Sequence, residues 1–415
     1  VDPSNGFTLF GGSPQSSYYP IDGSTNDAQQ GIRRTRIGSP DAQWERVEDV
    51  NIGVDLALLA GQLEASIDVY RRTVEDLLFN PPLPATAGAA QPPVRNVGSM
   101  RNDGIDISLR GSTSITEELT FDGSLNFTTY RNEITSIAPG IEFFSVPGAP
   151  VRNEVGHPIS SFFGYEVVGI WQNGEEIEQA NQQAPDGQFM PDAAPGRFRY
   201  EDVNGDGQIT PADRTHLGSP HPDFSYGLNL DFSYRGWNLS ALLYGEQGVD
   251  LWDQNLNSRD FPNFGTAQRK AALYDSWKPK DRSEPRMEWE AKNPGTDVPI
   301  QELSSFFSTN GVPNSYLLAD GSYLRLKTLQ LGYRLPSSLL EFAGAERLRL
   351  YVRAKNLFTI TSYRGLDPDI GATQSAVNAA EETGGRVETG ATAFGIDRGG
   401  YPAMRTYTVG LNLSF

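Results

Sequence analysis

The chain has 415 residues with 52 acidic and 34 basic side chains, a formal net charge of −18, and no cysteine. The acidic balance argues against a nucleic-acid-binding protein, which would carry a basic patch. The absence of cysteine excludes disulfide scaffolds, cysteine-ligated zinc and iron–sulfur clusters. Only 38% of the residues are apolar, and no stretch approaches the roughly 18–20 apolar residues of a transmembrane helix. Transmembrane β-barrels escape that test, because their strands alternate apolar and polar residues.

The start of the chain, Val1-Asp2-Pro3-Ser4, has neither a basic segment nor the apolar segment of a signal peptide. We therefore expect either that a leader has been removed or that the sequence starts partway through a longer protein.

Alternation with a period of two residues recurs along the chain and predicts β-strands. The clearest run, 223–235, alternates for twelve residues without an error, which a helical period of 3.6 residues cannot produce. In chain order, the predicted strands lie near residues 45–59, 63–79, 93–111, 118–134, 222–234, 237–249, 317–333, 347–360 and 402–415. Many are longer than the usual 5–6 residues or so of a globular strand, whereas a tilted strand needs about 9–11 to cross a bilayer.

The connections between these strands are short and long in turn. The short ones are 60–62, 112–117, 235–236 and 335–346, in which Pro336 precedes a predicted helical turn at 337–342; the long ones are 80–92, 135–221, 250–316 and 361–400. All long loops therefore emerge at one end, as in outer-membrane barrels with short periplasmic turns and long extracellular loops. The strands of a β-sandwich also have one polar face each, but nothing in a sandwich requires short and long connections to alternate. We predict an all-β fold, an antiparallel transmembrane β-barrel segment, in which 160–171 is either a loop hairpin or two further strands.

The last predicted strand ends in an aromatic residue. Phe415 closes the sequence, Tyr407 shares its face, and the alternation continues to the last residue. We interpret Tyr407 and Phe415 as a barrel-insertion signal and Phe415 as the genuine terminus of the mature protein; the alternative is a strand that happens to end in phenylalanine.

One motif within 135–221 predicts a metal site. Counted from Asp202, the twelve-residue segment 202–213 has the spacing of an EF-hand-type calcium loop, with Asp in place of Glu at the last position. The predicted Ca²⁺ ligands are Asp202, Asn204, Asp206, Gln208, Thr210 and Asp213. Gly207 permits the sharp turn that brings the Gln208 carbonyl to the ion. Long flanking helices are missing, so we expect a structural site rather than a sensor; the alternative is an Asn/Asp/Gly turn that binds nothing.

Other features are less specific. Aromatic residues at Tyr18–Tyr19, Phe162–Phe163, Trp171 and Phe306–Phe307 could stack on sugars or simply pack inside loops. The basic row Arg347, Arg349, Arg353 and Lys355 could pair with acids of neighbouring strands or form a track for an anionic substrate. The sequence contains no Gly-x-Ser-x-Gly, phosphate-loop or His-Glu-x-x-His motif, so we expect no enzymatic activity.

Several segments, taken together and in order, resemble the C-terminal half of SusC-like (SusC/RagA-type) TonB-dependent outer-membrane transporters of Bacteroidota. They include Asn96-Val97-Gly98-Ser99-Met100-Arg101-Asn102-Asp103-Gly104-Ile105-Asp106, Asp202 to Gly207 with Asp213-Arg214, Gly218 to Leu228, Ser322 to Lys327 with Leu331-Gly332-Tyr333, and Ala354-Lys355-Asn356-Leu357-Phe358.

The resemblance implies a closed 22-stranded barrel in the bacterial outer membrane with an N-terminal plug. It implies import of glycans or peptides driven by the TonB complex acting through the plug, and a SusD-like surface lipoprotein as a lid. Nine strands cannot close such a barrel, and an open edge in lipid would leave backbone groups unpaired. We therefore expect the plug and the remaining strands to come from another chain or from residues outside this sequence. The runner-up functions are a passive porin-like or adhesive barrel and a secreted calcium-binding β-sandwich.

Overall fold

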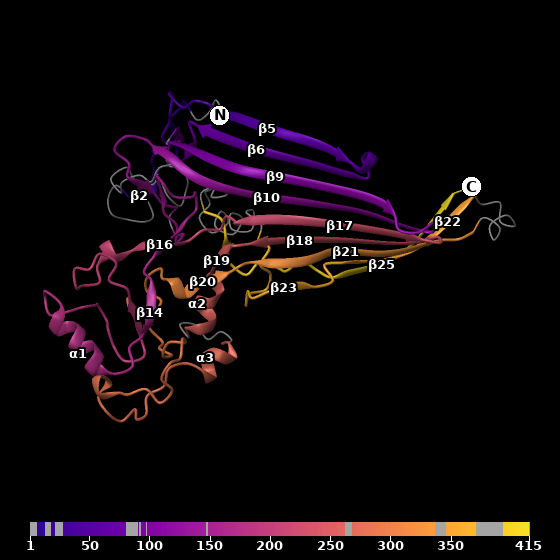
Figure 1. Cartoon of the computed structure of the whole chain (residues 1–415). Helices are drawn as coiled ribbons and strands as arrows, with labels where there is room; N and C mark the ends of the chain where they lie inside the picture. The colour runs from indigo at the N-terminus through magenta and orange to yellow at the C-terminus, as the bar shows by residue number, and fades with distance from the viewer. Residues whose placement is uncertain are drawn as a thin grey trace.

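The computed structural model describes residues 6–12, 18–20, 28–79, 90, 93–96, 98–146, 148–261, 268–336, 346–370 and 393–414. One antiparallel sheet dominates it (Figure 1). Nine long strands follow one another across this sheet in chain order: β5 (Arg46–Leu58), β6 (Leu63–Glu75), β9 (Gly98–Ser114), β10 (Leu119–Ile137), β17 (Phe224–Tyr234), β18 (Trp237–Gln247), β21 (Tyr323–Arg334), β22 (Arg347–Lys355) and β25 (Thr406–Ser414). The nine predicted strands and the antiparallel barrel-type sheet are thus confirmed.

Some predicted strands are interrupted. The strand predicted at 63–79 breaks at Asp76, and the one at 347–360 breaks at Asn356, where φ is 59° and 51°. These left-handed residues end β6 and β22 and begin separate short strands, β7 (Leu78–Phe79) and β23 (Thr359–Thr361). The strand predicted at 317–333 also divides, because β20 (Leu318–Asp320) joins a different sheet from β21. Conversely, β9 and β10 extend further than predicted, so their turn is 115–118 rather than 112–117.

The register makes one face of the sheet apolar and the other polar. One row of directly opposed residues across β5 to β21 is Leu56, Ala65, Leu109, Leu125, Leu228, Leu243 and Leu326, and a row across β18 to β25 is Leu239, Leu331, Val352 and Val409. The adjacent row, one residue along, is Asp55, Ser66, Ser108, Asn126, Gly227, Tyr244 and Arg325. Since successive side chains point to opposite faces, the apolar rows form one continuous surface suited to lipid.

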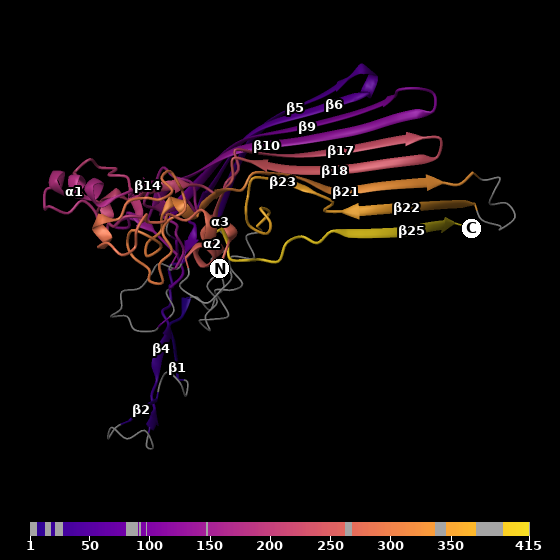
Figure 2. The same ribbon diagram turned by 90° about the horizontal axis from the view of Figure 1, so that it is seen from below.

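The two ends of the sheet differ. The short turns after β5, β9 and β17 lie at one end, together with the last residues of β21, and the described parts of the long connections gather at the other (Figures 1 and 2). These connections form what we call the loop body, residues 138–223, 248–322 and 356–405 where described. Two N-terminal strand pairs extend away from it (Figure 2): β1 (Leu9–Gly11) with β4 (Arg33–Arg36) and, between them in the chain, β2 (Tyr18–Pro20) with β3 (Ala28–Gln30).

The hydrophobic core lies in the loop body and not in the sheet. Its buried side chains form two main clusters, the first around Trp171, Phe198, Trp277 and Ile300, the second around Phe162, Trp252 and Ile396. The helices α1 (Gly174–Gln183), α2 (Gln254–Asp260) and α3 (Lys270–Tyr274) all belong to this body. No helix in the described residues is long and apolar enough to cross a membrane.

Candidate functional site

The long connections pack into one unit through a small mixed sheet. Strand β19 (Asp250–Asp253) pairs antiparallel with β20 and parallel with β24 (Ile396–Asp397), and Trp252 lies opposite Ile396. The ring of Trp252 packs on that of Phe162, with centroids 5.8 Å apart. Segments more than 140 residues apart in the chain therefore share one core above the long strands.

The segment 160–171, left open by the sequence, belongs to this loop body. It contains β13 (Phe162–Gly164), which pairs with β16 (Thr215–Gly218), and β14 (Val167–Ile170), which pairs with β15 (Phe198–Tyr200). It is therefore neither a hairpin closed on itself nor a pair of barrel strands. Of the aromatic side chains singled out here, Phe162 and Trp171 pack inside the loop body and are 0% and 2% exposed.

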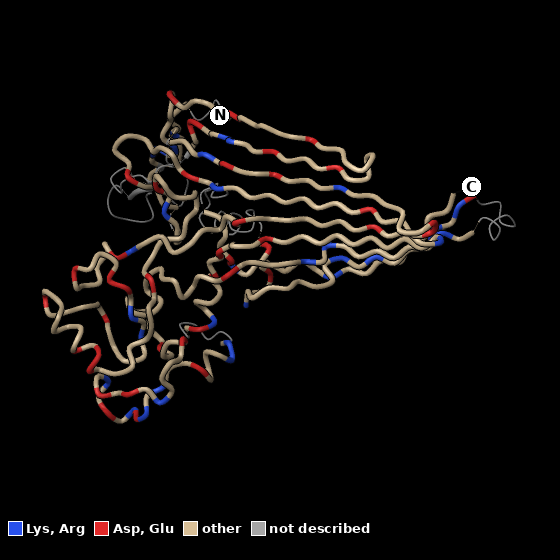
Figure 3. Tube along the Cα trace, viewed as in Figure 1, with Lys and Arg blue, Asp and Glu red and all other residues tan. Residues whose placement is uncertain are grey.

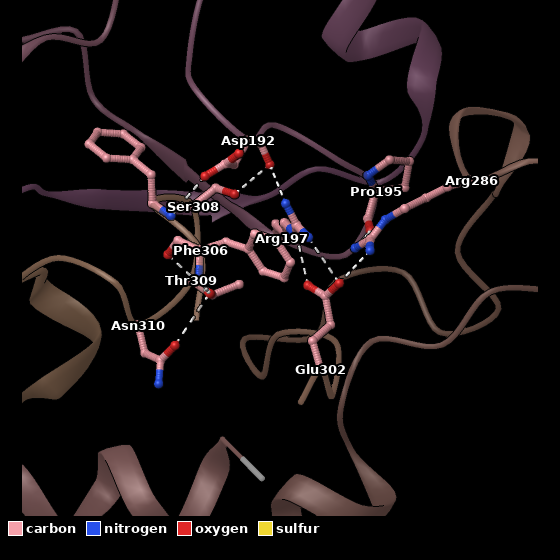
Figure 4. A network of polar contacts seen from close by, with 10 residues as sticks. Asp192, Pro195, Arg197, Arg286, Glu302, Phe306, Ser308, Thr309 and Asn310 are labelled. Carbon is pink, nitrogen blue, oxygen red and sulfur yellow. Dashed lines mark hydrogen bonds and ion pairs between the residues drawn. The ribbon is translucent and has the colours of Figure 1, made fainter. Parts of the chain in front are cut away.

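A buried ionic network joins two of the connections (Figure 4). Arg197, whose side chain is 7% exposed, donates from Nε and Nη2 to the two carboxylate oxygens of Glu302 at 2.7 and 3.0 Å. Its Nη1 donates to the Asp192 carbonyl at 2.7 Å, and its guanidinium lies 3.5 Å from the centre of the Phe306 ring. Arg286 pairs with the same carboxylate. The network joins residues about a hundred positions apart, so no local sequence pattern predicts it.

The two arginines control the charge state of Glu302. Burial alone would raise the pKa of this carboxyl group, but the hydrogen bonds from Arg197 and Arg286 outweigh burial and hold the pKa below its usual range. Glu302 is therefore ionised at neutral pH and holds two cations in place.

A second buried ion pair holds the α2–α3 region. Asp260 is 0% exposed; it accepts from Arg269 Nε at 2.5 Å and from the Tyr316 hydroxyl at 2.5 Å. The hydrogen bonds that Arg269 donates to Asp260 raise the pKa of Arg269, so its charge is fixed. Both networks link segments of the loop body through buried ion pairs.

Two histidines stack within the loop body. The rings of His157 and His216 are 3.6 Å apart, and His216 Nε2 lies 3.4 Å from Glu154. Burial lowers the pKa of His216, and the neighbouring His157 lowers it further, while the hydrogen bond with Glu154 opposes both effects. His216 therefore gains its proton below the usual histidine range.

Two cavities open in the loop body. The larger, about 520 Å³, has a mixed lining that includes apolar residues such as Leu273 and Trp277 and four basic residues, Lys278, Lys280, Arg282 and Lys292. The smaller, about 270 Å³, lies where the loop body meets the polar face of β21. There Arg325, 3% exposed, pairs with Asp367, and Lys327 Nζ lies 2.7 Å from Asp369. Both cavities are candidate contact sites for a polar molecule entering at this end.

The predicted calcium ligands lie on one partly exposed loop, which is organised by hydrogen bonds to its own side chains. The Asp202 carboxylate accepts from the backbone N–H groups of Gly205, Asp206 and Gly207 at 2.8, 3.2 and 2.8 Å. Gly205 and Gly207 have φ of 72° and 85°, which glycine adopts without strain. Asp206 in turn accepts from the Gln208 N–H at 2.9 Å.

The last predicted ligand closes this loop. Asp213 is 0% exposed; it accepts from the Val203 N–H at 3.1 Å and, as part of a capping box, from the Thr210 N–H at 2.7 Å. Within the part of the chain that the structure describes, no three His, Cys, Asp or Glu side chains are grouped so that they could hold a metal ion. The calcium site therefore stays a prediction.

The other sequence-based sites are partly described. Tyr407 lies on the apolar face of β25 and is 67% exposed, whereas Phe415 lies outside the described residues, as do 337–342. In the basic row of β22, Arg349 and Arg353 donate to the neutral amides of Asn238 and Gln330 at 2.8 Å each. Pairing of this row with acids of neighbouring strands is not found among the described residues.

Known proteins share this architecture. Residues 2–160 match the family described as TonB dependent receptor-like, beta-barrel. TonB-dependent receptor P3 of Formosa agariphila is 31% identical over 407 residues, which are 96% of this chain and 37% of that protein. TonB-dependent receptor SusC of Bacteroides thetaiotaomicron is 24% identical over 403 residues, 94% of this chain and 34% of that protein.

A solved structure agrees. The "Structure of the RagAB peptide transporter" superposes with a TM-score of 0.72 at 26% identity and covers 99% of this chain and 38% of that one. The chain thus spans little more than a third of the length of the relatives it matches. These matches confirm the SusC/RagA resemblance and the location in the bacterial outer membrane. In sequence and in fold the chain is similar to the TonB-dependent receptor β-barrels, and its nine long strands correspond to part of such a barrel.

Proposed function

We propose that the protein works in active nutrient uptake, as part of a SusC-like importer that carries an oligosaccharide or a peptide across the outer membrane. Energy would come from the TonB complex acting through a plug, a SusD-like lipoprotein would cover the loop body, and no catalysis is involved. The observation that carries this proposal is the sheet of nine long strands with one continuous apolar face and the described long connections at one end, in a chain similar to this family.

The geometry supports this role physically. The apolar face would meet lipid and the polar face would line the lumen, so the loop body would lie on the extracellular side, where substrate arrives. A core with buried ion pairs such as Arg197–Glu302 gives that side a fixed shape. Fixed loops recognise a ligand at lower entropic cost than mobile ones.

Two substrate classes, oligosaccharides and peptides, are compatible with this architecture. RagAB is described as a peptide transporter, and SusC is described as a TonB-dependent receptor. Charged and polar cavity linings, as in the loop body here, suit either class.

Uptake measurements in the native host test the proposal. Cells carrying the intact receptor should accumulate a labelled oligosaccharide or peptide, and accumulation should stop when an uncoupler collapses the inner-membrane proton gradient. Uptake that continues unchanged would indicate a passive porin, and binding without uptake would indicate an adhesin. Recovery of the protein in the aqueous phase without detergent would indicate a soluble β-sandwich.

We further propose that the 202–213 loop binds Ca²⁺ as a structural ion. Support comes from the ligand spacing and from the Asp202 carboxylate, which already holds the loop in a tight turn. Ca²⁺ prefers six to eight oxygen ligands, and this loop offers carboxylate, amide, hydroxyl and carbonyl oxygens. The ion would relieve repulsion within 135–221, which carries 12 acids and 4 bases.

Calcium titration of the intact protein tests this site. The wild type should bind one Ca²⁺ that protects 135–221 from protease, and Asp206→Ala should abolish both the binding and the protection. Asp186→Ala, in an exposed turn of the same connection, is the matched control and should change neither. Equal protease cleavage with Ca²⁺ and with chelator in the wild type would refute the proposal.

A further inference from the structure

The larger cavity of the loop body, about 520 Å³, is lined by α3 and by the loop 278–292 that follows it. Its volume is in the range of pockets that hold a small ligand. Leu273 and Trp277 form an apolar part of the wall. The charged residues of the lining are four cations and one acid: Lys278, Lys280, Arg282, Lys292 and Asp281. Figure 3 shows Lys and Arg along this loop, at the bottom of the loop body, where Asp and Glu also occur.

Most of these cations lack a carboxylate partner. Among the described residues only Lys280 has one, and this partner, Glu290, lies outside the lining at 2.5 Å. Lys278 donates from Nζ to a backbone carbonyl at 2.9 Å. Neither Arg282 nor Lys292 forms an ion pair in the part of the chain that the structure describes. In a chain of net charge −18, this local excess of positive charge favours an anionic ligand.

The side chains of the lining indicate which anions fit. The single acid, Asp281, accepts from the N–H and the hydroxyl of Ser283 at 2.8 and 2.7 Å, so its carboxylate is engaged within its own turn. Three of the four cations are lysines, whose ammonium groups act as point charges, whereas arginine matches planar oxyanions bidentately. The combination therefore suits a carboxylate as well as a sulfate group.

The backbone of the loop 278–292 is already hydrogen-bonded. The Lys280 N–H donates to the Glu290 carbonyl at 2.9 Å, and the Lys292 N–H donates to the Lys278 carbonyl at 2.7 Å. A peptide that adds as a strand needs free backbone groups on the edge that it joins. Recognition at this cavity would therefore run through side chains, which suits the oxyanion of an acidic sugar better than a peptide backbone.

The loop body that holds the cavity is fastened to the polar face of the sheet. Tyr130 and Asn132 share this face of β10 with Asn126. The Tyr130 hydroxyl lies 3.1 Å from His221 Nδ1, and Asn132 Oδ1 accepts from the Ile159 N–H at 2.8 Å. In the proposed function this face lines the lumen, so the cavity belongs to the body that an arriving substrate meets.

We propose that this cavity binds an acidic saccharide, a sugar unit that carries a carboxylate or a sulfate group. The oxyanion would lie against Arg282 and Lys292, the two cations that form no ion pair among the described residues. A C–H face of the sugar ring would pack on the apolar part of the wall, where Leu273 is 56% exposed. The inference rests on the proposed function and narrows its substrate to an acidic oligosaccharide.

Isothermal titration calorimetry on the intact receptor, purified in detergent, tests this inference. The probes are tetragalacturonate, its fully methyl-esterified neutral form, a sulfated chondroitin tetrasaccharide and tetraglutamate. At least one of the two acidic saccharides should bind, the neutral ester about tenfold more weakly or not at all, and tetraglutamate no better than the ester. The acidic saccharide that binds more tightly shows whether the site prefers carboxylate or sulfate.

Charge reversal assigns the binding to the cavity. Arg282→Glu and Lys292→Glu should each weaken binding about tenfold, whereas Lys292→Arg keeps the charge and should retain it. Both side chains are exposed, so the substitutions should leave the fold intact. Arg364→Glu, at an exposed arginine of the loop body that lines neither cavity, is the matched control and should not change the affinity.

Several results would overturn the inference: equal binding of tetragalacturonate and its neutral ester, tighter binding of tetraglutamate, no binding of either acidic saccharide, or unchanged affinity in both charge-reversal variants. Binding is measured without uptake, so its failure is distinguishable from failure of the proposed function. A receptor that binds the acidic saccharide but imports nothing would refute the proposed function alone. Energised uptake of a neutral glycan or a peptide, without binding of an acidic saccharide, would refute this inference alone.

Discussion

The Arg197–Glu302–Arg286 network provides the sharpest test of how the loop body is held together. Glu302→Gln keeps the shape of the side chain and one acceptor oxygen but leaves two guanidinium groups without their carboxylate. Arg197 is 7% exposed, so its charge would remain buried. Removing one partner of a buried pair costs about 3–5 kcal/mol, and we expect the lower end of that range because the amide oxygen still accepts one hydrogen bond and Arg286 is partly exposed.

Hydrogen exchange of two backbone amides measures this cost locally. Phe198 N–H donates to the Ser308 carbonyl at 2.9 Å, and Ile300 N–H donates to the Gly196 carbonyl at 2.8 Å. Both bonds join the connections that the network holds. A loss of about 3 kcal/mol should accelerate their exchange by about 100-fold at neutral pH.

An exposed ion pair provides the control variant, and the pH dependence of exchange provides a second test. Glu290→Gln removes the partner of Lys280, but both side chains are more than 60% exposed, so exchange should not change measurably. The folded-state pKa of Glu302 is lowered, so its contribution is full above the pKa of the unfolded chain and is lost as pH falls through the folded-state value. The difference between wild type and Glu302→Gln should therefore vanish in acid. Equal exchange at neutral pH, or a difference that persists in acid, would refute the reasoning.

Three further perturbations test other parts of the molecule. Val409→Lys places a charge at the middle of β25 on the apolar face and should destabilise the membrane-inserted barrel by about 2–4 kcal/mol. Thr408→Lys, on the polar face, is the control and should leave the unfolding midpoint nearly unchanged. Equal unfolding midpoints for the two variants would show that the faces are misassigned. Trp252→Ala removes a side chain 2% exposed in the loop-body core and should cost about 3–5 kcal/mol, seen as loop cleavage by protease at lower temperature. Because burial lowers the pKa of His216, the local stability of residues 153–164 should fall as pH drops below the usual histidine pKa of about 6.5. Amide hydrogen exchange measures this stability, and protection of 153–164 that is the same at pH 8 and pH 5 would contradict the prediction.

The family relationship and most of the long strands could be predicted from the sequence, because strand alternation is a local property. In the 223–235 run, the alternation alone assigns each residue to one face of the strand. Because short and long connections alternate along the chain, the long loops are predicted to lie at one end. The strand breaks at Asp76 and Asn356 were missed, since alternation does not register a single residue in the left-handed region.

The loop body could not be predicted in the same way. Its contacts join residues far apart in the chain, such as Arg197 with Glu302 and Trp252 with Ile396. The sequence of 160–171 is equally compatible with a hairpin and with barrel strands, and only its pairing with 198–200 and 215–218 decided between them. The spacing of the 202–213 loop predicts its ligands, but spacing alone does not determine whether an ion binds.

By itself, then, the sequence determined which residues of each long strand face lipid and which face the lumen, because a two-residue period assigns faces without reference to other strands. Only the tertiary structure decided which charges are paired. Arg325 and Arg349 are both polar-face arginines of neighbouring strands, but Arg325 meets carboxylates brought back by the loop body, whereas Arg349 meets Asn238 and a like charge on Arg334. Ion pairing depends on distances between distant segments, and these distances exist only once the chain has folded.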